Sequence, residues 1–529
     1  MTRITARRVS YMAVLGAVAL VAAACGGNSS KSTAAATGST ATGAPAAASS
    51  PKSGGSLSIG VEAVWHPIDP LDATTFTDHD VSMAVLAPLF DLGPGGTLQP
   101  DLATGYTAQN GNKTYVITLR KNVTFQDGTP FNAQAVVFNL QRDANPANAC
   151  KCLVDLKDLS SVVATDPTTV TVNLTHPDST FPSLMADSPG MMASPTALQQ
   201  EGKGFGLHPV GAGPFKFVSE VANSSITLAK WPGYWNAPKP YLDSVTFKVI
   251  PDVSTRLASL QSGAIQDDED IEPTEISTVQ SASNLKVESL GGVGTYFVEF
   301  QTQRAPLDNV LARQAVTYAT DPQVIDNALF AGKAATGIES PWTAQSWAYP
   351  GPSVPGYQAY NLAKAKQLVG QLGGLSFTLS IRNDATSVAV GQALQSEWAA
   401  AGIKVQLNEL QNLALVQDSQ TGKFQAMFYR LAGSYEPDGN ASLYFRSGSP
   451  QNSVKLNDPA VDQLLTQERE ATTQAARKPI FQSLAAQLAK DVPEDYLFAA
   501  DWWRASVSNL QGIPKLANNW MELQGAWLS

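Results

Sequence analysis

The chain has 529 residues, enough for between three and four domains at roughly 150 residues each. Apolar residues make up 43% of it, which argues against a disordered chain and against a membrane protein with many spanning helices. Charged residues are only 15%, and a net charge of -10 argues against a broad basic surface for nucleic acid. Neutral polar residues therefore cover most of the surface, and few charged residues remain for catalysis.

The N-terminus predicts export. Three arginines in the first eight residues precede an uncharged run of fourteen, which is too short to span a membrane but fits a secretory signal. Small residues then lead to Cys25, which resembles a bacterial lipoprotein signal in which the cysteine becomes the lipidated N-terminus. Ala22 stands where the commonest form has leucine, and ordinary cleavage near Ala24 is the alternative. We predict that residues 1–25 are a signal peptide ending at lipidated Cys25, on the outer face of the cell membrane.

The next segment, 26–54, predicts a flexible tether. It consists almost entirely of Gly, Ser, Ala and Thr, and so has little to bury in a core. About thirty residues of this kind reach roughly 30 Å. A lipid, a tether and a large body suit a protein that works just outside a membrane.

The body that follows mixes strands and helices. Alternating apolar residues predict strands over 56–61, 114–119, 169–174, 226–229, 245–250, 296–300, 377–381, 405–407 and 424–429. Helical periodicity and capping residues predict helices over 80–90, 132–140, 254–262, 321–332, 361–372, 390–401 and 458–490, the last broken at Pro479. The alternation is most regular after residue 290, which is typical of an α/β layer.

Two cysteines in the body, Cys150 and Cys152, are separated by a single residue. In an exported protein two such thiols tend to oxidise, so a local disulfide and two free thiols are both open. The pair lacks the second ligand pair of a zinc site, and no histidine is near it in sequence.

A search for catalytic or metal-binding motifs finds none. The four histidines have no cysteine or carboxylate at ligand spacing, and no nucleophile elbow, phosphate loop or dinucleotide fingerprint is present. The acidic run 267–272 lacks the glycine of a calcium loop and is predicted to be a solvated surface loop. A large exported body of this kind indicates a binding protein, with no enzyme activity, metal site or cofactor.

Several stretches are similar to one protein family. The most specific is 119–138, where an F-x-D-G-x-P turn at 125–130 joins a strand to a helix, and 209–215 resembles a second Gly/Pro turn of that family. Further stretches follow in the family's order: 234–235, 239–243, 250–257, 260–263, 313–316, 401–405 and 458–465. On these motifs the chain resembles the extracytoplasmic solute-binding proteins of peptide/nickel-type ABC importers, the oligopeptide- and dipeptide-binding lipoproteins.

The resemblance implies an α/β fold of two hinged lobes, like that of periplasmic binding proteins, with an extra α+β domain. The implied boundaries are 55–90, 206–288 and 496–529 for a discontinuous lobe I, 91–205 for the extra domain, and 289–495 for lobe II. The ligand lies between the lobes, which close around it by hinge motion.

The implied function is that of the lipid-anchored binding component of an ABC importer. It captures peptides or peptide-like solutes and delivers them to a membrane permease with its ATPase subunits. The resemblance implies a monomer with no cofactor and no nucleic-acid partner. Two alternatives remain: the same fold used for sensing or for another solute, such as a metal chelate or a sugar, and a secreted hydrolase, against which the missing nucleophile–base pair argues.

The resemblance also points to one stretch for the ligand's amine. Peptide-binding members often hold this amine on the Asp of a D-Y-x-x-P stretch, and the matching stretch here is 433–438. Ser434 stands in place of that Asp, and a neutral hydroxyl cannot pair with an ammonium. Glu436 or Asp438 is expected to supply the charge instead, unless the ligand has no free amine. Tyr435 is expected to form an aromatic wall.

Other ligand contacts are expected from position in the family alone. Six residues are expected to face the cleft, from the loop after the first strand, the start of lobe II and the end of a lobe II strand: Trp65, His66, Asp69, Phe76, Tyr296 and Arg382. Arg382 is suited to meet a carboxylate. Trp502 and Trp503 are interpreted as packing residues.

Overall fold

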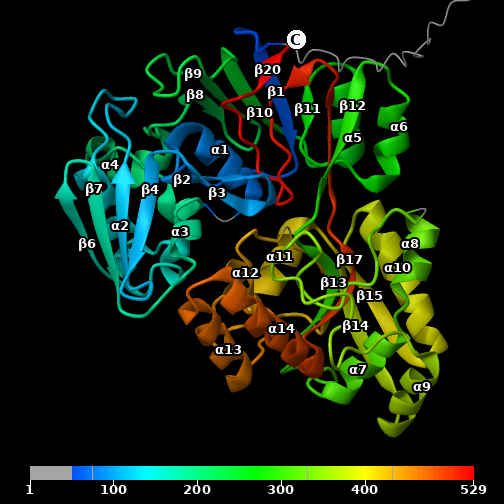
Figure 1. The fold of residues 1–529 in the computed structure, drawn as a ribbon. Helices are drawn as coiled ribbons and strands as arrows, with labels where there is room; N and C mark the ends of the chain where they lie inside the picture. Colours follow the sequence, from blue (N-terminus) through cyan, green and yellow to red (C-terminus); the bar gives the residue numbers. More distant parts are fainter. Residues whose placement is uncertain (1–49, 74, 331, 432) are drawn as a thin grey trace, which may run out of the picture. The chain divides into compact units, whose positions relative to one another are not determined.

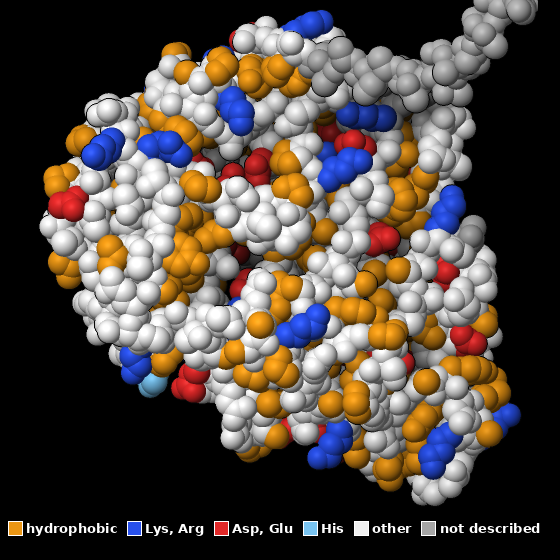
Figure 2. All heavy atoms as spheres, viewed as in Figure 1, with side chains coloured by type: hydrophobic (Ala, Val, Ile, Leu, Met, Phe, Trp, Pro, Cys, Tyr) orange, Lys and Arg blue, Asp and Glu red, His pale blue; other side chains and the backbone are white. Residues whose placement is uncertain are grey.

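The computed structural model describes residues 50–73, 75–330, 332–431 and 433–529. The predicted signal peptide, Cys25 and most of the predicted tether lie outside these residues. No helix within the described ranges is both long and apolar enough to cross a membrane. The face shown in Figure 2 is largely neutral, with charged side chains scattered over it, as the low charged fraction predicts.

A seven-stranded sheet gathers segments that are far apart in the sequence (Figure 1). In order across the sheet its strands are β12 (Leu285–Gly291), β18 (Trp502–Val507), β11 (Asp267–Asp268), β1 (Ser56–Val61), β10 (Ser244–Val249), β9 (Ser225–Lys230) and β8 (Phe215–Val221). The central strand β1 runs parallel to β10 and β11, while the other pairs are antiparallel. Leu57, Ile59 and Val61 of β1 are buried, which explains the alternation in the sequence.

A five-stranded sheet follows in the second half of the chain. Its strands are β15 (Ile403–Leu410), β14 (Leu375–Arg382), β16 (Ala426–Arg430), β13 (Thr295–Phe300) and β17 (Glu494–Ala499). The helices of this half include α7 (Val310–Ala319), α8 (Pro322–Leu329), α9 (Leu362–Gln371), α10 (Ala385–Ala400), α11 (Asn412–Thr421) and α12 (Pro437–Phe445). Helix α10 packs on β14 and β15, and its Trp398 is fully buried against Phe377.

A third, four-stranded antiparallel sheet lies between residues 103 and 174. Its strands are β4 (Ala103–Gln109), β5 (Thr114–Leu119), β7 (Thr169–Leu174) and β6 (Leu159–Asp166), with α2 (Ala133–Asp143) packed on β6 and β7. The F-x-D-G-x-P turn joins this part to the seven-stranded sheet, because Gln126 Nε2 donates to the carbonyls of Val85, Gly213 and Phe215 at 3.1, 3.2 and 2.8 Å. Both glycine-containing turns that carry the resemblance therefore meet at one junction.

Three helices differ most from their predicted bounds, and one of them, α10, begins at Ala385 instead of residue 390. Helix α1 spans Phe76–Leu86 instead of 80–90, because Thr75 and Asp78 form a capping box at its start and β2 (Phe90–Gly93) begins soon after it. The predicted helix over 458–490 is two helices, α13 (Pro459–Glu470) and α14 (Gln474–Asp491). The break falls where Thr473 caps α14, and Pro479 lies inside that helix instead of ending it.

The acidic run is buried, so its prediction as a solvated loop was wrong. Asp267 and Asp268 form β11 inside the seven-stranded sheet. Arg256 Nε lies 2.5 Å from an oxygen of Asp268, and Arg430 Nη2 lies 2.8 Å from one of Asp270. The local sequence does not predict the ion pair between Arg430 and Asp270, because Arg430 comes 160 residues after Asp270.

Candidate ligand-binding cavity

A cavity of about 450 Å³ lies where the seven-stranded sheet, the five-stranded sheet and the segment 91–205 contribute side chains together. The first contribution comes from the end of β1, the start of α1 and the C-terminal segment. Phe76 packs edge-on against Trp502, with ring centres 5.4 Å apart. His79 stacks on Trp520, with ring centres 3.4 Å apart. This wall is therefore mainly aromatic.

The five-stranded sheet contributes two arginines, and protein carboxylates already neutralise both. Arg430 reaches across to Asp270 at 2.8 Å, donates to Tyr296 Oη at 3.1 Å and lies over the ring of Trp502 at 4.0 Å. Burial raises the pKa of Tyr296 above its ordinary value, so its hydroxyl keeps its proton.

Arg382 lies among three carboxylates. Its guanidinium is 2.5 Å from Asp384, 3.6 Å from Glu272 and 3.8 Å from Glu62. A ligand carboxylate would have to compete with these groups. The structure thus places Arg382 on the cavity, but with its charge already satisfied.

The stretch expected to hold an amine lines the cavity through Gly433, Ser434, Tyr435 and Glu436. Ser434 Oγ accepts from the backbone N–H of Glu436 at 3.2 Å, and Tyr435 Oη accepts from that of Ala517 at 2.6 Å. Glu436 binds Arg477 through both oxygens, at 2.5 and 3.0 Å. The negative charge of Glu436 is therefore already neutralised by Arg477.

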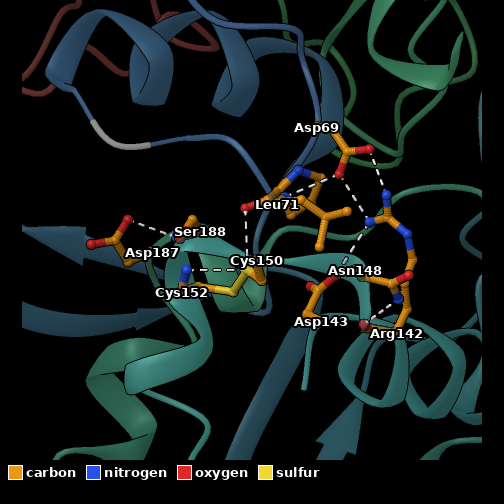
Figure 3. Close-up of a disulfide and its surroundings, with 10 residues drawn as sticks. Asp69, Leu71, Arg142, Asp143, Asn148, Cys150, Cys152, Asp187 and Ser188 are labelled. Carbon is orange, nitrogen blue, oxygen red and sulfur yellow. Dashed lines mark hydrogen bonds and ion pairs between the residues drawn. A yellow bond between two sulfur atoms is a disulfide. The ribbon is translucent and has the colours of Figure 1, made fainter. Parts of the chain in front are cut away.

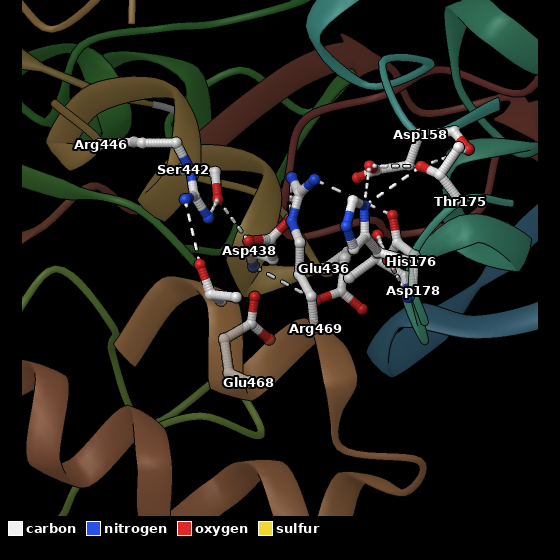
Figure 4. A network of polar contacts seen from close by, with 12 residues as sticks. Asp158, Thr175, His176, Asp178, Glu436, Asp438, Ser442, Arg446, Glu468 and Arg469 are labelled. Carbon is white, nitrogen blue, oxygen red and sulfur yellow. Dashed lines mark hydrogen bonds and ion pairs between the residues drawn. The ribbon is translucent and has the colours of Figure 1, made fainter. Parts of the chain in front are cut away.

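Asp438 belongs to a buried polar network shown in Figure 4. Its side chain is fully buried and lies 2.5 Å from Arg469 Nη2. Asp178, from the segment 91–205, lies 3.9 Å from Arg469 Nη1. Burial alone would raise the pKa of Asp438, but the Arg469 charge, together with a hydrogen bond from Glu468, lowers it below the ordinary value. Burial and the charge of Asp438 raise the pKa of Glu468 well above normal.

The segment 91–205 supplies the remaining wall, around a 3-10 turn at Lys151–Val154. A disulfide joins Cys150 and Cys152, which decides between the two states that the sequence left open. The backbone N–H of Lys151 donates to Leu71 O at 2.9 Å. Asp187 and Ser188 lie beside the disulfide in Figure 3.

The ten predicted contacts divide into two groups. Six line the cavity: Phe76, Tyr296, Arg382, Ser434, Tyr435 and Glu436. Four do not: Trp65, His66, Asp69 and Asp438.

Three of those outside the cavity have partners elsewhere. Trp65 Nε1 donates to Glu220 at 3.1 Å, and His66 Nδ1 lies 2.9 Å from Asp78. Asp69 binds Arg142 through both oxygens, as Figure 3 shows.

Several lining residues had no signal in the sequence. Trp502, interpreted as a packing residue, is buried and also lines the cavity. Residues that sequence reasoning missed also include His79, Asp155, Asp187 and Trp520. None follows a predicted strand or belongs to a motif, so only the folded chain brings them to one place.

Comparisons with known proteins agree on one family. Residues 97–453 match the family described as bacterial extracellular solute-binding proteins, family 5 Middle. The glutathione-binding protein GsiB of Shigella flexneri is 31% identical over 472 residues, which are 86% of this chain and 91% of that protein.

Two solved structures share the fold. The oligopeptide-binding protein AppA of Bacillus subtilis, in complex with a nonapeptide, has a TM-score of 0.82 at 23% identity, covering 91% of this chain and 100% of that one. NikZ of Campylobacter jejuni, in complex with Ni(L-His), has a TM-score of 0.81 at 22% identity, covering 89% and 99%. At these identities the two structures support the two-lobed fold and leave the ligand open.

Proposed function

Since the chain belongs to the bacterial extracellular solute-binding proteins of family 5 and is the solute-binding component of an ABC importer, we propose that it captures peptides or peptide-like solutes in the cavity described above. The observation that carries this proposal is that protein carboxylates already form ion pairs with both arginines of the cavity: Glu272 with Arg382 and Asp270 with Arg430. Because carboxylates of the protein already pair with these two guanidinium groups, the cavity offers a solute aromatic faces, neutral polar groups and the carboxylates of Asp155 and Asp187. Aromatic and polar groups of this kind suit a peptide backbone and tolerate varied side chains.

The relatives support this solute class. A glutathione-binding protein is 31% identical, and glutathione is itself a small peptide. We propose further that the chain acts as a monomer, without catalysis or a cofactor, and passes its solute to a permease with ATPase subunits.

We assign the seven-stranded sheet to lobe I, the five-stranded sheet to lobe II and residues 91–205 to an extra domain. In this assignment lobe II extends to residue 499, because β17 pairs along β13. Six lining residues form the proposed ligand contacts: Phe76, Tyr296, Arg382, Ser434, Tyr435 and Glu436.

A peptide ligand is expected to stabilise the folded protein. At a hundredfold excess over its Kd it should raise the free energy of unfolding by about 2.7 kcal/mol, because it binds only the folded state. A thermal-shift screen of short peptides, glutathione, sugars and nickel–histidine measures this, after refolding to remove any co-purified solute. Native mass spectrometry then identifies the complex. A shift with a sugar or with nickel–histidine, and with no peptide, would contradict the peptide proposal and favour another solute.

We also propose that lipid on Cys25 holds the protein at the outer face of the membrane. Replacing Cys25 with serine removes the acceptor thiol, so the protein should move from the membrane fraction to the soluble extracytoplasmic fraction. Fractionation followed by mass spectrometry of the N-terminus checks both location and lipid. Ser30→Ala, in the predicted tether, is the matched control and should stay with the membrane. Membrane association of Cys25→Ser equal to that of the control would exclude this anchor.

A further inference from the structure

One carboxylate on the cavity wall has no cationic partner. Asp187 lines the cavity with 46% of its side chain exposed, and one of its oxygens accepts from the backbone N–H of Ser188 at 2.6 Å. No Lys or Arg in the described part of the chain forms an ion pair with it. The other carboxylates discussed on this cavity, Glu62 and Glu436, face Arg382 and Arg477.

A second carboxylate lies on the same wall. Asp155 lines the cavity, and its side chain makes no hydrogen bond or ion pair with the described residues. Burial first, and then repulsion by Asp187, raises the pKa of Asp155 to about 7, although Arg469 opposes this. Burial likewise raises the pKa of Asp187 to about 6. Neither carboxylate forms an ion pair with a Lys or Arg among the described residues, although the more distant charge of Arg469 acts on Asp155.

A buried histidine faces this wall from α1. His79 is 4% exposed and lines the cavity, and its Nε2 lies 4.0 Å from Asp187 Oδ1, too far for a hydrogen bond. Neither ring nitrogen meets the usual distance and angle of a hydrogen bond with a described residue, and a weaker contact reaches the backbone of Ala186. Burial lowers the pKa of His79 to about 3, so the ring is neutral and cannot supply the missing positive charge. An unpartnered polar group that is so deeply buried indicates a place for a donor from outside the protein.

We propose that the ammonium group of a peptide-like solute binds between Asp187 and Asp155, beside the Nε2 atom of His79. A primary ammonium has three N–H donors, and this place offers two carboxylates and one imidazole nitrogen as acceptors. The inference rests on the proposed function and deepens it, because it assigns the amine to the wall formed by the extra domain.

The competing positions on the opposite wall are less suitable. Ser434 carries no charge, Glu436 is bound by Arg477, and Asp438 is buried against Arg469. An ammonium placed at Glu436 or Asp438 would have to displace a guanidinium from a hydrogen-bonded pair. At Asp187 no guanidinium has to be displaced.

The test compares free and blocked amines by isothermal titration calorimetry at pH 7.5. The probes are glutathione and trialanine, each with its N-acetyl derivative. The unaltered protein should bind the free amines about 10- to 100-fold more tightly, the range expected for a hydrogen-bonded charged group. Asp187→Asn should reduce this preference to about threefold or less, while its amide still caps Ser188. Asp155→Asn should reduce it in part.

One variant serves as the control. Asp158→Asn removes a carboxylate of the same domain that pairs with His176 and does not line the cavity, so the preference should stay unchanged. Ser434→Asp tests the alternative position, because the family pattern alone predicts that this variant gains preference for free amines. A gain in Ser434→Asp, with no loss in Asp187→Asn, would overturn the inference and place the amine beside Ser434.

The pH dependence gives a separate readout. The pKa of Asp187 is about 6, so its carboxylate is ionised above this pH and protonated below it. The preference for free amines should therefore rise between pH 5 and pH 7.5. The groups that face Asp187 are Asp155, the neutral His79 and the Ser188 N–H. A profile that stays flat down to about pH 3.5, where an ordinary carboxylate is also protonated, would contradict the assignment even if Asp187→Asn failed to fold.

The outcomes separate the two proposals. If no peptide binds to the unaltered protein, the proposed function fails. If peptides bind equally well with and without the acetyl group, or if Asp187→Asn keeps the full preference, the amine assignment fails and peptide binding stands.

Discussion

Replacing Arg469 with alanine should lower the free energy of unfolding by about 3–5 kcal/mol, the range found when one partner of a buried ion pair is removed. Asp438 is fully buried and 2.5 Å from the Arg469 guanidinium, and Asp178 is 3.9 Å away. Without Arg469 both carboxylates stay in the interior and lose the one ion-pair partner that each has among the described residues. The contact also joins α13 to the extra domain, so its loss weakens two parts of the protein at once.

The pH dependence of this loss has a definite sign. Although burial opposes it, Arg469 holds the pKa of Asp438 below its ordinary value, so the pair contributes stability above about pH 4 and loses it as the pH falls. In Arg469→Ala the pKa of Asp438 rises, and protonation relieves the buried charge. The difference between the two proteins should therefore shrink between pH 7 and pH 4.5.

Urea unfolding followed by tryptophan fluorescence measures both effects. Arg304→Ala is the control, because Arg304 is exposed and makes only a weak bond of 3.3 Å to a carbonyl. It should cost less than about 1 kcal/mol. A loss of that small size in Arg469→Ala, or one that does not change with pH, would show that the network does not depend on Arg469.

Replacing Gly433 with alanine should destabilise the protein by about 3 kcal/mol or more and weaken ligand binding at least tenfold. The residue has a φ of +77°, which costs an alanine about 1–2 kcal/mol. A Cβ atom there would lie 2.4 Å from Gly294 N and 2.4 Å from Val293 C, so backbone has to move as well. The same loop carries Ser434 and Tyr435 into the cavity, and its displacement changes the binding wall.

Gly448→Ala separates the cost of the positive φ from the cost of the close approach between the added Cβ atom and the backbone. Gly448 has a φ of +75°, but a Cβ atom added there meets no atom within 4 Å. It should therefore cost only about 1–2 kcal/mol and leave ligand affinity unchanged. Chemical unfolding and calorimetric titration of the two variants give the comparison. Equal losses in both would mean that the close approach to Gly294 has no effect of its own.

The sequence predicted those parts of the fold that depend on local signals. The strands 114–119 and 169–174 have the predicted bounds, because apolar alternation and the flanking turns are encoded within the strand itself. Helix α2 begins after Asn132 as predicted, since its cap is local. The buried position of the acidic run was missed, because Arg504 beside Asp267 and Arg430 beside Asp270 both come from distant parts of the chain.

The cavity residues likewise fall into those that a local position in the sequence predicts and those that only the folded chain brings together. Tyr296 and Arg382 were found because each lies on a strand of the five-stranded sheet, where the resemblance to the family gives a position. Asp155, Asp187 and His79 come from three separate turns and helices and have no shared pattern in sequence. Their proximity depends on how the segment 91–205 packs beside α1, which no short window of sequence specifies.

The disulfide in the cavity wall bears on when the protein becomes able to bind. Disulfides form in oxidising compartments and are rare in a reducing cytoplasm. The Cys150–Cys152 bond lies beside Asp187, so the wall we assign to the amine receives its covalent link only once the chain has left the cytoplasm (Figure 3). Until then, backbone contacts such as Lys151 N–H to Leu71 O hold that turn. The covalent link in this wall is thereby tied to an oxidising compartment, while the position of the turn itself is not.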